Sequence, residues 1–385
     1  MRRVKLKLLR VCLLLLLLGG CSNNTKSIQN LAYVTAIGLD YVDGQYIAYV
    51  QVLNFIDVAK TEQIDIGKNV PVWIGKGVGR TVNDSITSIY PTSQLRLFWG
   101  HVKSIVCSER LLKNGTILHE AYEAINRYRE VRYNVIVYGT KQPIPQIFSQ
   151  KALLNMSALD SLLDRPEESY NQLSRLKPQY GFKLIAELNE PARTAMLPSI
   201  TIQQGTWMED TSPKSMFLVE GASMFAGQQW KGWYSAEQLK GARWLQHSTK
   251  RVIINVPDHG KPHATLVLTK PSHKIKPVLD NGEVKFDIEV QAHGFVDQLI
   301  TNLTRRELEA EAEAAVEQQI RFTFQQGLPH QTDTLNLLYS LYKKHPQQWE
   351  HLQESGKLAM NDQMIREVKV KVKLIHSGKY KGRTR

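Results

Sequence analysis

The hydrophobic and polar positions of the chain predict strands that have one buried and one solvated face. In residues 284–290 and 368–374 every second residue is apolar, which is typical of such strands. Residues 31–37 and 46–55 are rich in β-branched and aromatic residues, and Asp43-Gly44 lies between them. Asp-Gly is a favoured hairpin turn. The sequence therefore predicts a β-hairpin near its beginning and amphipathic strands near its end.

Helical spacing of apolar positions is clearest in residues 308–320. Thr304 and Glu307 precede this segment with the spacing of a capping box, and Gly327 follows it, so the longest helix is predicted there. A similar capping pattern at the start of residues 235–245 predicts a short helix. Strands and helices are thus expected in both halves of the chain.

Three glycines, Gly75, Gly77 and Gly79, lie between a predicted strand and a predicted helix that extends to Tyr90. Dinucleotide-binding loops share this context, but they need a third glycine three positions after the second. Arg80 occupies that position. The pattern therefore favours a tight turn over a nucleotide site.

Prolines interrupt the periodic pattern between residues 189 and 214, where Gly205 also lies. We place the main domain boundary there. An N-terminal module, with two possible subdomains, is predicted over residues 31–205, and a C-terminal domain over residues 206–376. The last residues, 377–385, form a basic tail.

The first residues have the organisation of an export signal. A cationic segment precedes an apolar run over residues 11–18, which is too short to cross a bilayer because crossing takes about 20 residues. The following Gly19-Gly20-Cys21 resembles the bacterial lipobox. This implies cleavage between Gly20 and Cys21, with S-diacylglycerol and N-acyl groups on Cys21. We predict a signal peptide over residues 1–20 and a polar tether over residues 21–30. The alternative is an ordinary secretory signal with a coincidental cysteine.

The basic charge of the chain changes this picture only slightly. The formal net charge of +13 includes five cationic residues of the leader, so about +8 belongs to the mature chain. A basic exported protein suits anionic lipid or wall polymer better than nucleic acid, and no nucleic-acid partner is predicted. Lys369, Lys371 and Lys373 occupy one face of a predicted strand. They are expected to form a solvated edge, or alternatively to contact headgroups or an acidic partner surface.

No residue is identified as catalytic, as cofactor-binding or as a metal ligand. The sequence lacks the motifs of zinc proteases, serine hydrolases, P-loop proteins and paired-cysteine metal sites. Cys107 lies in an apolar stretch and is interpreted as a buried small hydrophobe. His101 lies beside aromatic residues and is interpreted as structural. His259 and His263 are expected in a loop, not at a metal.

Seven stretches of the chain have a recognisable order and spacing, and they are residues 31–40, 51–55, 71–77, 97–101, 127–133, 197–200 and 241–245. Together with the lipobox they resemble the Ger(x)C family, the lipoprotein C-subunits of spore germinant receptors. The resemblance extends from Cys21 to the helix before Pro346. The order of the stretches is more specific than any one of them.

The resemblance implies a lipid-anchored, non-enzymatic subunit of a nutrient germinant receptor, on the outer surface of the spore inner membrane. It also implies A- and B-type membrane-embedded subunits as partners. Members of the family are α+β proteins with mixed or antiparallel sheets flanked by helices, in two or three domains. This agrees with the predicted order of strands and helices. Only Cys21 is carried over as a site residue.

Two other functions are considered beside the receptor subunit. A germinant-binding lipoprotein would capture the nutrient itself, in a pocket lined by Trp73, Trp99, Trp230 and Trp233. An exported hydrolase would act on wall polymer, although no residue is identified as its acid or base. Binding of amino acids or sugars would support the first function, and turnover of peptidoglycan fragments the second.

Overall fold

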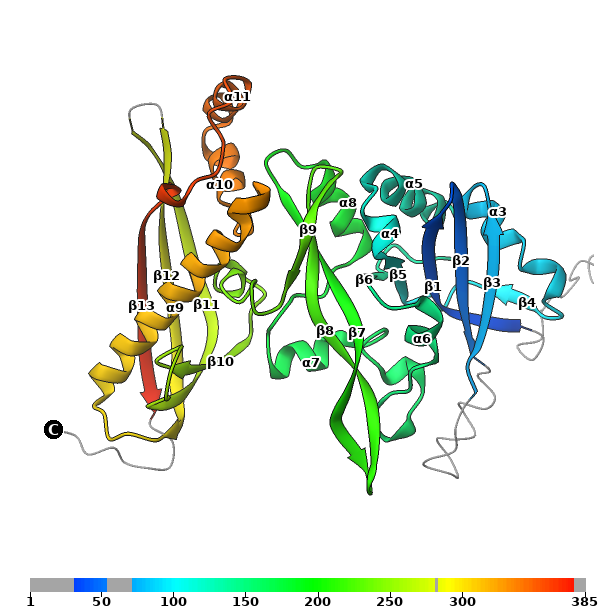
Figure 1. Ribbon diagram of the computed structural model, residues 1–385, viewed down its shortest axis with the longest axis horizontal. Coiled ribbons are helices and arrows are strands. Elements are labelled where there is room, and N and C mark those ends of the chain that lie inside the picture. The colour runs from blue at the N-terminus through cyan, green and yellow to red at the C-terminus, as the bar shows by residue number, and fades with distance from the viewer. Residues whose placement is uncertain (1–30, 54–70, 281–282, 377–385) are drawn as a thin grey trace, which may run out of the picture.

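The computed structural model describes residues 31–53, 71–280 and 283–376. The predicted leader, tether and basic tail lie outside the described residues. So do residues 54–70 and residues 281 and 282. The described chain is an α+β protein with two sheets, which Figure 1 shows in separate halves of the molecule along its long axis. The predicted fold class is therefore confirmed.

Residues 31–235 contribute nine strands to one mixed sheet in the described part of the chain. The strands are β1 Leu31–Val42, β2 Gln45–Leu53, β3 Trp73–Gly79, β4 Arg96–Phe98, β5 Ser104–Ser108, β6 Ile136–Thr140, β7 Thr194–Glu209, β8 Ser212–Ala226 and β9 Gln229–Ser235. Their order is β3-β2-β1-β5-β6-β7-β8-β9, with β4 paired to β1. The central pairs from β1 through β5 and β6 to β7 are parallel, whereas the pairs toward each edge are antiparallel.

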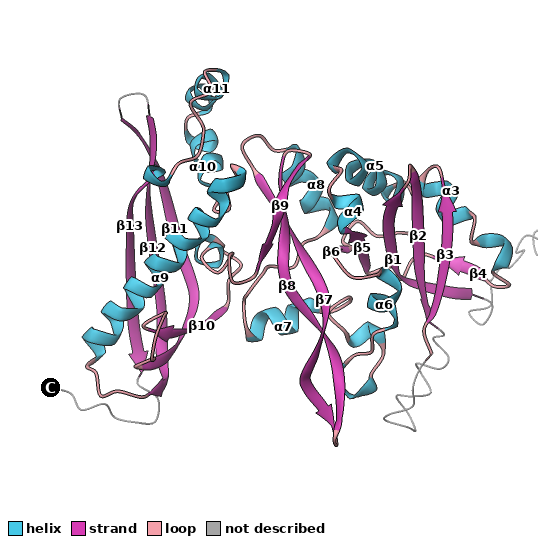
Figure 2. Ribbon diagram, in the orientation of Figure 1, coloured by secondary structure: helices cyan, strands magenta, loops and turns pink. Residues whose placement is uncertain are grey.

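Helices cover both faces of this sheet (Figures 1 and 2). The helices of this half are α3 Val82–Thr87, α4 Glu109–Leu112, α5 Gly115–Asn126, α6 Ile144–Ser149, α7 Pro166–Gln172 and α8 Gly181–Asn189, with short 3-10 turns at η2 Tyr90–Thr92, η3 Leu153–Asn155 and η4 Ala158–Asp160. Apolar residues of α3, α4, α5 and α8 form the core on one face. The core on the other face includes Ile144, Ile147 and Phe148 of α6. Both faces of the sheet are therefore buried under helices.

The turn between β1 and β2 confirms the predicted hairpin. Asp43 and Gly44 have φ values of 50° and 78°, and the flanking Val42 and Gln45 are paired. Positive φ at both central residues suits the right-handed twist of the flanking strands, which is why Asp-Gly is favoured there.

The glycine-rich segment is a strand and not the predicted turn. Gly75, Gly77 and Gly79 all belong to β3, which pairs with β2 along its length. A Cβ on Gly77 would lie 1.9 Å from the carbonyl oxygen of Ser85, and one on Gly79 would lie 2.4 Å from Asp84. The glycines therefore allow α3 to pack directly on the strand, which explains them without a ligand.

Gly77→Ala is expected to lower the free energy of unfolding by about 2 kcal/mol, because the added methyl group would force α3 away from β3. Urea unfolding followed by circular dichroism measures this change. Lys76→Ala is the matched control, since Lys76 is an exposed neighbour on the same strand. Equal stability of the two variants would contradict the packing explanation.

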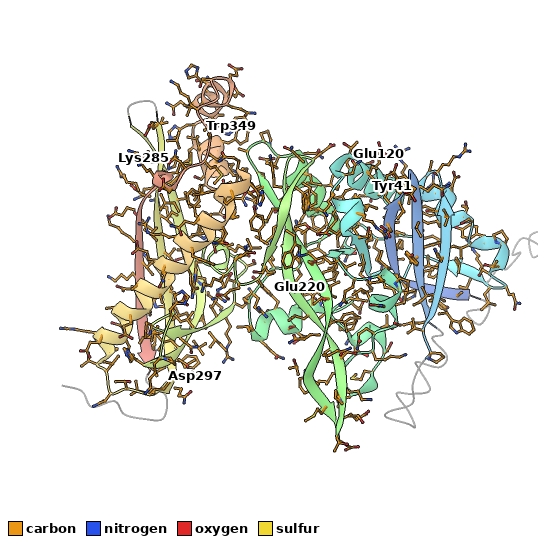
Figure 3. All side chains as sticks on the ribbon, viewed as in Figure 1. Tyr41, Glu120, Glu220, Lys285, Asp297 and Trp349 are labelled. Atoms are coloured by element: carbon orange, nitrogen blue, oxygen red, sulfur yellow. The ribbon has the colours of Figure 1, made fainter. Side chains whose placement is uncertain are left out.

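The second half contains a four-stranded sheet in the order β10-β11-β12-β13. Its elements are β10 Arg251–Val256, β11 Ala264–Asp280, β12 Glu283–Leu299, β13 Ile365–His376, α9 Arg305–Gly327, α10 Leu337–Lys344 and α11 Pro346–Glu354. The capping box at Thr304 and Glu307 begins α9, as predicted. Trp349 of α11, labelled in Figure 3, packs edge-on against Tyr342 of α10, with ring centroids 5.1 Å apart.

The second sheet has one buried and one wet face, as the alternating pattern predicts. Phe286, Ile288 and Val290 of β12 are almost completely buried in the core that they form with α9. On the other face, Lys276 of β11 forms an ion pair with Glu289 of β12. On the same face, Asp287 of β12 forms an ion pair with Arg366 of β13. The helix thus covers only the apolar face.

β13 is an edge strand of the described sheet, and α9 protects its free edge. The backbone N–H groups of Val372 and Leu374 donate to carboxylates of α9, Glu313 at 3.0 Å and Glu309 at 2.9 Å. Unpaired N–H groups on an edge would otherwise be free to pair with another chain. Lys371 and the other lysines of this strand remain exposed, as predicted for a solvated edge.

The two sheets divide the chain later than the predicted boundary near residue 205. That position falls inside β7, and the first sheet continues to the end of β9 at Ser235. The segment from Ser235 to Arg251 then connects the sheets. It forms turns and the 3-10 helix η5 Ala242–Leu245. Ser235 and Gln238 do exchange the hydrogen bonds of a capping box, yet no α-helix follows them.

Hydrogen bonds join the two halves directly. The side-chain amide of Asn336, which precedes α10, accepts from the N–H of Thr194 at 2.8 Å and donates to its carbonyl at 3.1 Å. The hydroxyl of Ser174 accepts from the N–H groups of Lys250 and Arg251. These bonds hold the start of β7 and the loop after α7 against the second half of the molecule.

Candidate functional site

The predicted cleavage and lipidation residues, Gly20 and Cys21, lie outside the described residues, so lipidation remains a prediction. The described chain starts at Leu31, the first residue of β1. Among the helices of the described segments, none combines the length and apolar character needed to cross a bilayer.

Cys107 lies at the centre of the first sheet on β5 and is about 1% exposed. Burial raises the pKa of its thiol to about 12. A thiol that stays protonated is a poor nucleophile, so the interpretation as a small core residue agrees with its environment.

His101 lies between β4 and β5, with its ring centroid 5.2 Å from Tyr33 and 5.8 Å from Phe98. Burial lowers the pKa of His101, and the positive charges of Arg132 and Lys103 lower it further. A neutral imidazole packed between two rings fits the structural role predicted from the sequence.

The four tryptophans considered for a germinant pocket do not come together. Trp73 is on β3 at one edge of the sheet and is 70% exposed. Trp230 and Trp233 are on β9 at the opposite edge, where the ammonium group of Lys141 lies 3.1 Å from the centre of the Trp233 ring. Of the four, Trp99 lines the cleft that is described next. No single pocket contains all four.

The cleft beside Trp99 has a volume of about 910 Å³, and we call it the arginine cleft. Two of the stretches that carry the family resemblance, 97–101 and 127–133, contribute to its walls, together with residues of α3, η2 and the segment before β4. The residues that line it are Asn83, Tyr90, Ser93, Gln94, Leu95, Arg96, Leu97, Trp99, Ala124, Arg127, Tyr128, Arg129 and Glu130.

The arginine cleft has an aromatic wall and a cationic rim. The rings of Trp99 and Tyr128 have centroids 5.7 Å apart, and burial followed by the nearby Tyr90 raises the pKa of Tyr128 to about 12. The Glu130 carboxylate accepts hydrogen bonds from the Arg96 guanidinium at 3.2 Å and from the backbone N–H of Trp99 at 3.3 Å. Such a surface suits an apolar or aromatic ligand that carries a carboxylate.

A second cleft, of about 610 Å³, lies between the two halves of the molecule, and we call it the junction cleft. Its walls come from α8 and the start of β7, from the segment after η5, from β11, and from the face of α10 that includes Tyr339, Lys343 and Lys344. Sequence reasoning missed this cleft because its residues come from segments that are far apart in the chain. For the arginine cleft, a local signal existed in the cluster of charged residues at 127–132.

Two histidines stack in the wall of the junction cleft. His247 and His273 have ring centroids 4.3 Å apart and an interplanar angle of 27°. Burial, and then the neighbouring His247, lowers the pKa of His273 from 6.5 to about 4. His273 is therefore neutral in the folded protein at neutral pH.

This depressed pKa predicts an acid-sensitive contribution to stability. Below pH 6.5 the unfolded chain takes up a proton at His273 that the folded protein accepts only near pH 4, so stability is lost as the pH falls through this window. Because His273 is partly exposed, we expect a loss of only about 2 kcal/mol. His273→Gln should reduce the difference in unfolding free energy between pH 7 and pH 4 by this amount. An unchanged difference in urea titrations would contradict it.

The described residues assemble no metal centre. No group of three or more potential ligands lies close enough together to hold a metal ion in the part of the chain that the structure describes. His259 and His263 lie in the loop before β11, as predicted, and His263 hydrogen-bonds Glu311 at 2.8 Å.

Family models match the chain in both halves. Residues 24–202 match the model described as the spore germination protein N-terminal domain. Residues 220–378 match the model described as spore germination B3/GerAC like, C-terminal. The change from one model to the other falls within the β7–β8 hairpin.

Two proteins of Bacillus subtilis (strain 168) are similar to the chain over most of its length. Spore germination protein KC is 24% identical over 369 residues, which cover 90% of each chain. Spore germination protein B3 is 21% identical over 290 residues, or 74% of this chain and 72% of that protein. The crystal structure of the GerBC protein matches 88% of this chain and 96% of its own, at 17% identity and a TM-score of 0.49. With both family models matched in order along one chain, the protein belongs to the Ger(x)C family of spore germination proteins.

Proposed function

We propose that this protein is the lipid-anchored, non-enzymatic subunit of a nutrient germinant receptor complex. In this proposal Cys21 carries the lipid, and the folded part lies on the outer surface of the spore inner membrane. Its partners there are the membrane-embedded A- and B-type subunits. The single observation that carries the proposal is membership of the spore germination family over both halves of the chain.

A lipid anchor would explain how a water-soluble fold acts beside membrane proteins. Confinement to the membrane raises the effective concentration of the partners, so weak protein contacts suffice for assembly. The wet face of the second sheet and the long β7–β8 hairpin leave extensive surface for such contacts (Figure 1).

Crosslinking in intact spore membranes tests the partnership. A photoreactive residue is placed at Trp73 or at Ile253, which are exposed positions on the first and second sheet. Peptides of membrane-embedded receptor subunits are expected among the crosslinked products of at least one position. The matched control carries the photoreactive residue at Phe225, a buried side chain without hydrogen bonds, and should give no intermolecular product. Recovery of lipid or unrelated proteins alone from both exposed positions would contradict the proposal.

The arginine cleft supports a second candidate function, direct capture of the germinant. Its aromatic wall at Trp99 and Tyr128 and the cationic Arg127 and Arg129 match an amino acid or a similar small carboxylate. Isothermal titration of the purified protein with amino acids and sugars measures such binding. Arg129→Gln should abolish a saturable signal if this function is correct, whereas no signal with any nutrient would remove it.

A further inference from the structure

The junction cleft concentrates positive charge between the two halves of the molecule. Its walls contain a single carboxylate, that of Glu187. They contain five cationic side chains, which are Lys177, Arg193, Lys274, Lys343 and Lys344. The cations come from four separate segments, so they are brought together only by the fold. This arrangement is distinct from the arginine cleft, which lies within the first half.

Little of this charge is neutralised by the protein. Glu187 is engaged by Arg193, at 3.2 Å, and also accepts from Gln179 at 2.8 Å. Lys177 and Lys274 have no ion pair with the described residues, and Lys344 donates only to a backbone carbonyl, that of Ile275. Burial lowers the pKa of Lys177 and of Lys344, and neighbouring cations lower both further, while Glu187 offsets part of the shift at Lys177. At Lys344 every cause of the shift is burial or a neighbouring cation, which indicates positive charge without a matching counter-charge.

The Arg193 guanidinium is held in position before any ligand arrives. Besides its bond to Glu187, it lies 4.7 Å from the centre of the Tyr339 ring, over the face of that ring. An arginine fixed in this way loses little conformational freedom when it binds an oxyanion, so it is suited to recognise a carboxylate or phosphate. Lys343, one turn further along α10, approaches the same ring at 5.9 Å.

The size and polarity of the cleft define the ligand class. A volume of about 610 Å³ lies in the range of small-molecule sites, which are common where two parts of a protein meet. Gln246, Ser248 and Ser340 add neutral hydrogen-bonding groups to the walls. We propose that the junction cleft binds a small anion that carries two or more carboxylate or phosphate groups. Bound there, the anion would bridge the two halves and couple them.

Binding is tested with the full chain in detergent, at constant ionic strength. The probes are citrate, pyrophosphate and glycerol phosphate, with chloride as the control anion. Isothermal titration is expected to give saturable binding of citrate or pyrophosphate, and the anion should raise Tm because it binds the folded protein. Stronger binding of citrate or of pyrophosphate identifies the preferred group. Glycerol phosphate carries a single phosphate group, as a lipid headgroup can, so binding as strong as that of citrate or pyrophosphate would contradict the requirement for two anionic groups.

Lys274→Gln combined with Lys343→Gln should weaken binding by about tenfold or more, since it removes two of the five cations. The matched control is Lys371→Gln combined with Lys373→Gln, which removes the same charge from exposed positions on β13 outside the cleft. Without anion, the cleft variant should be at least as stable as the unmodified protein, because repulsion between cations is relieved. No saturable binding of any probe, or equal weakening in the cleft and control variants, would overturn the proposal.

Discussion

Replacing Cys21 by alanine is expected to move the protein from the membrane fraction to the soluble fraction and to impair nutrient-triggered germination. The thiol is the attachment point of the predicted lipid. Each buried CH₂ group of an acyl chain contributes about 0.8 kcal/mol, and one chain alone binds only reversibly. Removal of every acyl chain should therefore release nearly all of the protein from the membrane. Fractionation of spore membranes, followed by immunoblotting, measures it.

Cys12 provides the matched control for this experiment. It lies inside the predicted signal peptide, so Cys12→Ala should leave both membrane retention and germination unchanged. Mass spectrometry of the N-terminal peptide supplies a second readout, because an acylated Cys21 must appear as the first mature residue. If Cys21→Ala stays in the membrane fraction and germination is normal, the anchor is not at this cysteine.

Local sequence patterns were sufficient wherever one turn or one periodicity decides the structure. The Asp43-Gly44 turn was predictable because few other residues adopt positive φ at both central positions. The helix after Thr304 was predictable because the capping box, the apolar stripe and Gly327 all indicate the same element. Agreement between such independent local signals makes an element readable from one sequence.

Long-range packing decided the features that the sequence did not reveal. Gly77 was assigned to a turn because turns use glycine often, but here the glycine is needed so that α3 can approach β3. Pro198 and Pro213 interrupt the periodic pattern of the sequence, yet they lie in the paired strands β7 and β8. The cations of the junction cleft are scattered along the chain. In each case the partner is remote in sequence.

The stretch 241–245, which carries part of the family resemblance, also has a packing explanation. Its Gly241 lies so close to α9 that a Cβ would be 2.2 Å from the carbonyl of Gln319. The indole N–H of Trp244 donates to the side-chain oxygen of Gln319 at 2.9 Å, and Arg243 donates to the same oxygen at 3.1 Å. This stretch is therefore the contact through which the connecting segment docks on the second half.

Gln319→Leu is expected to lower the free energy of unfolding by about 3 to 5 kcal/mol, because it leaves several polar groups unpaired at once. Gln319 is 2% exposed, and its amide also donates to the carboxylate of Asp258 at 2.6 Å. Trp244 is fully buried, so its N–H has no access to water as a replacement acceptor. Loss of the Gln319 acceptor affects Arg243 even more strongly, because burial already lowers the pKa of its guanidinium to about 10. Urea unfolding measures the loss.

Gln318→Leu makes the same chemical change one residue earlier on α9, where the side chain is exposed. Away from the buried network this change should shift the unfolding free energy by no more than about 0.5 kcal/mol. The difference between the two variants therefore isolates the buried hydrogen bonds from the effect of replacing an amide by an apolar side chain in a helix. If both variants lose little stability, the segment 241–245 is held to α9 by apolar packing alone, and the polar network has no measurable share in joining it to the second half.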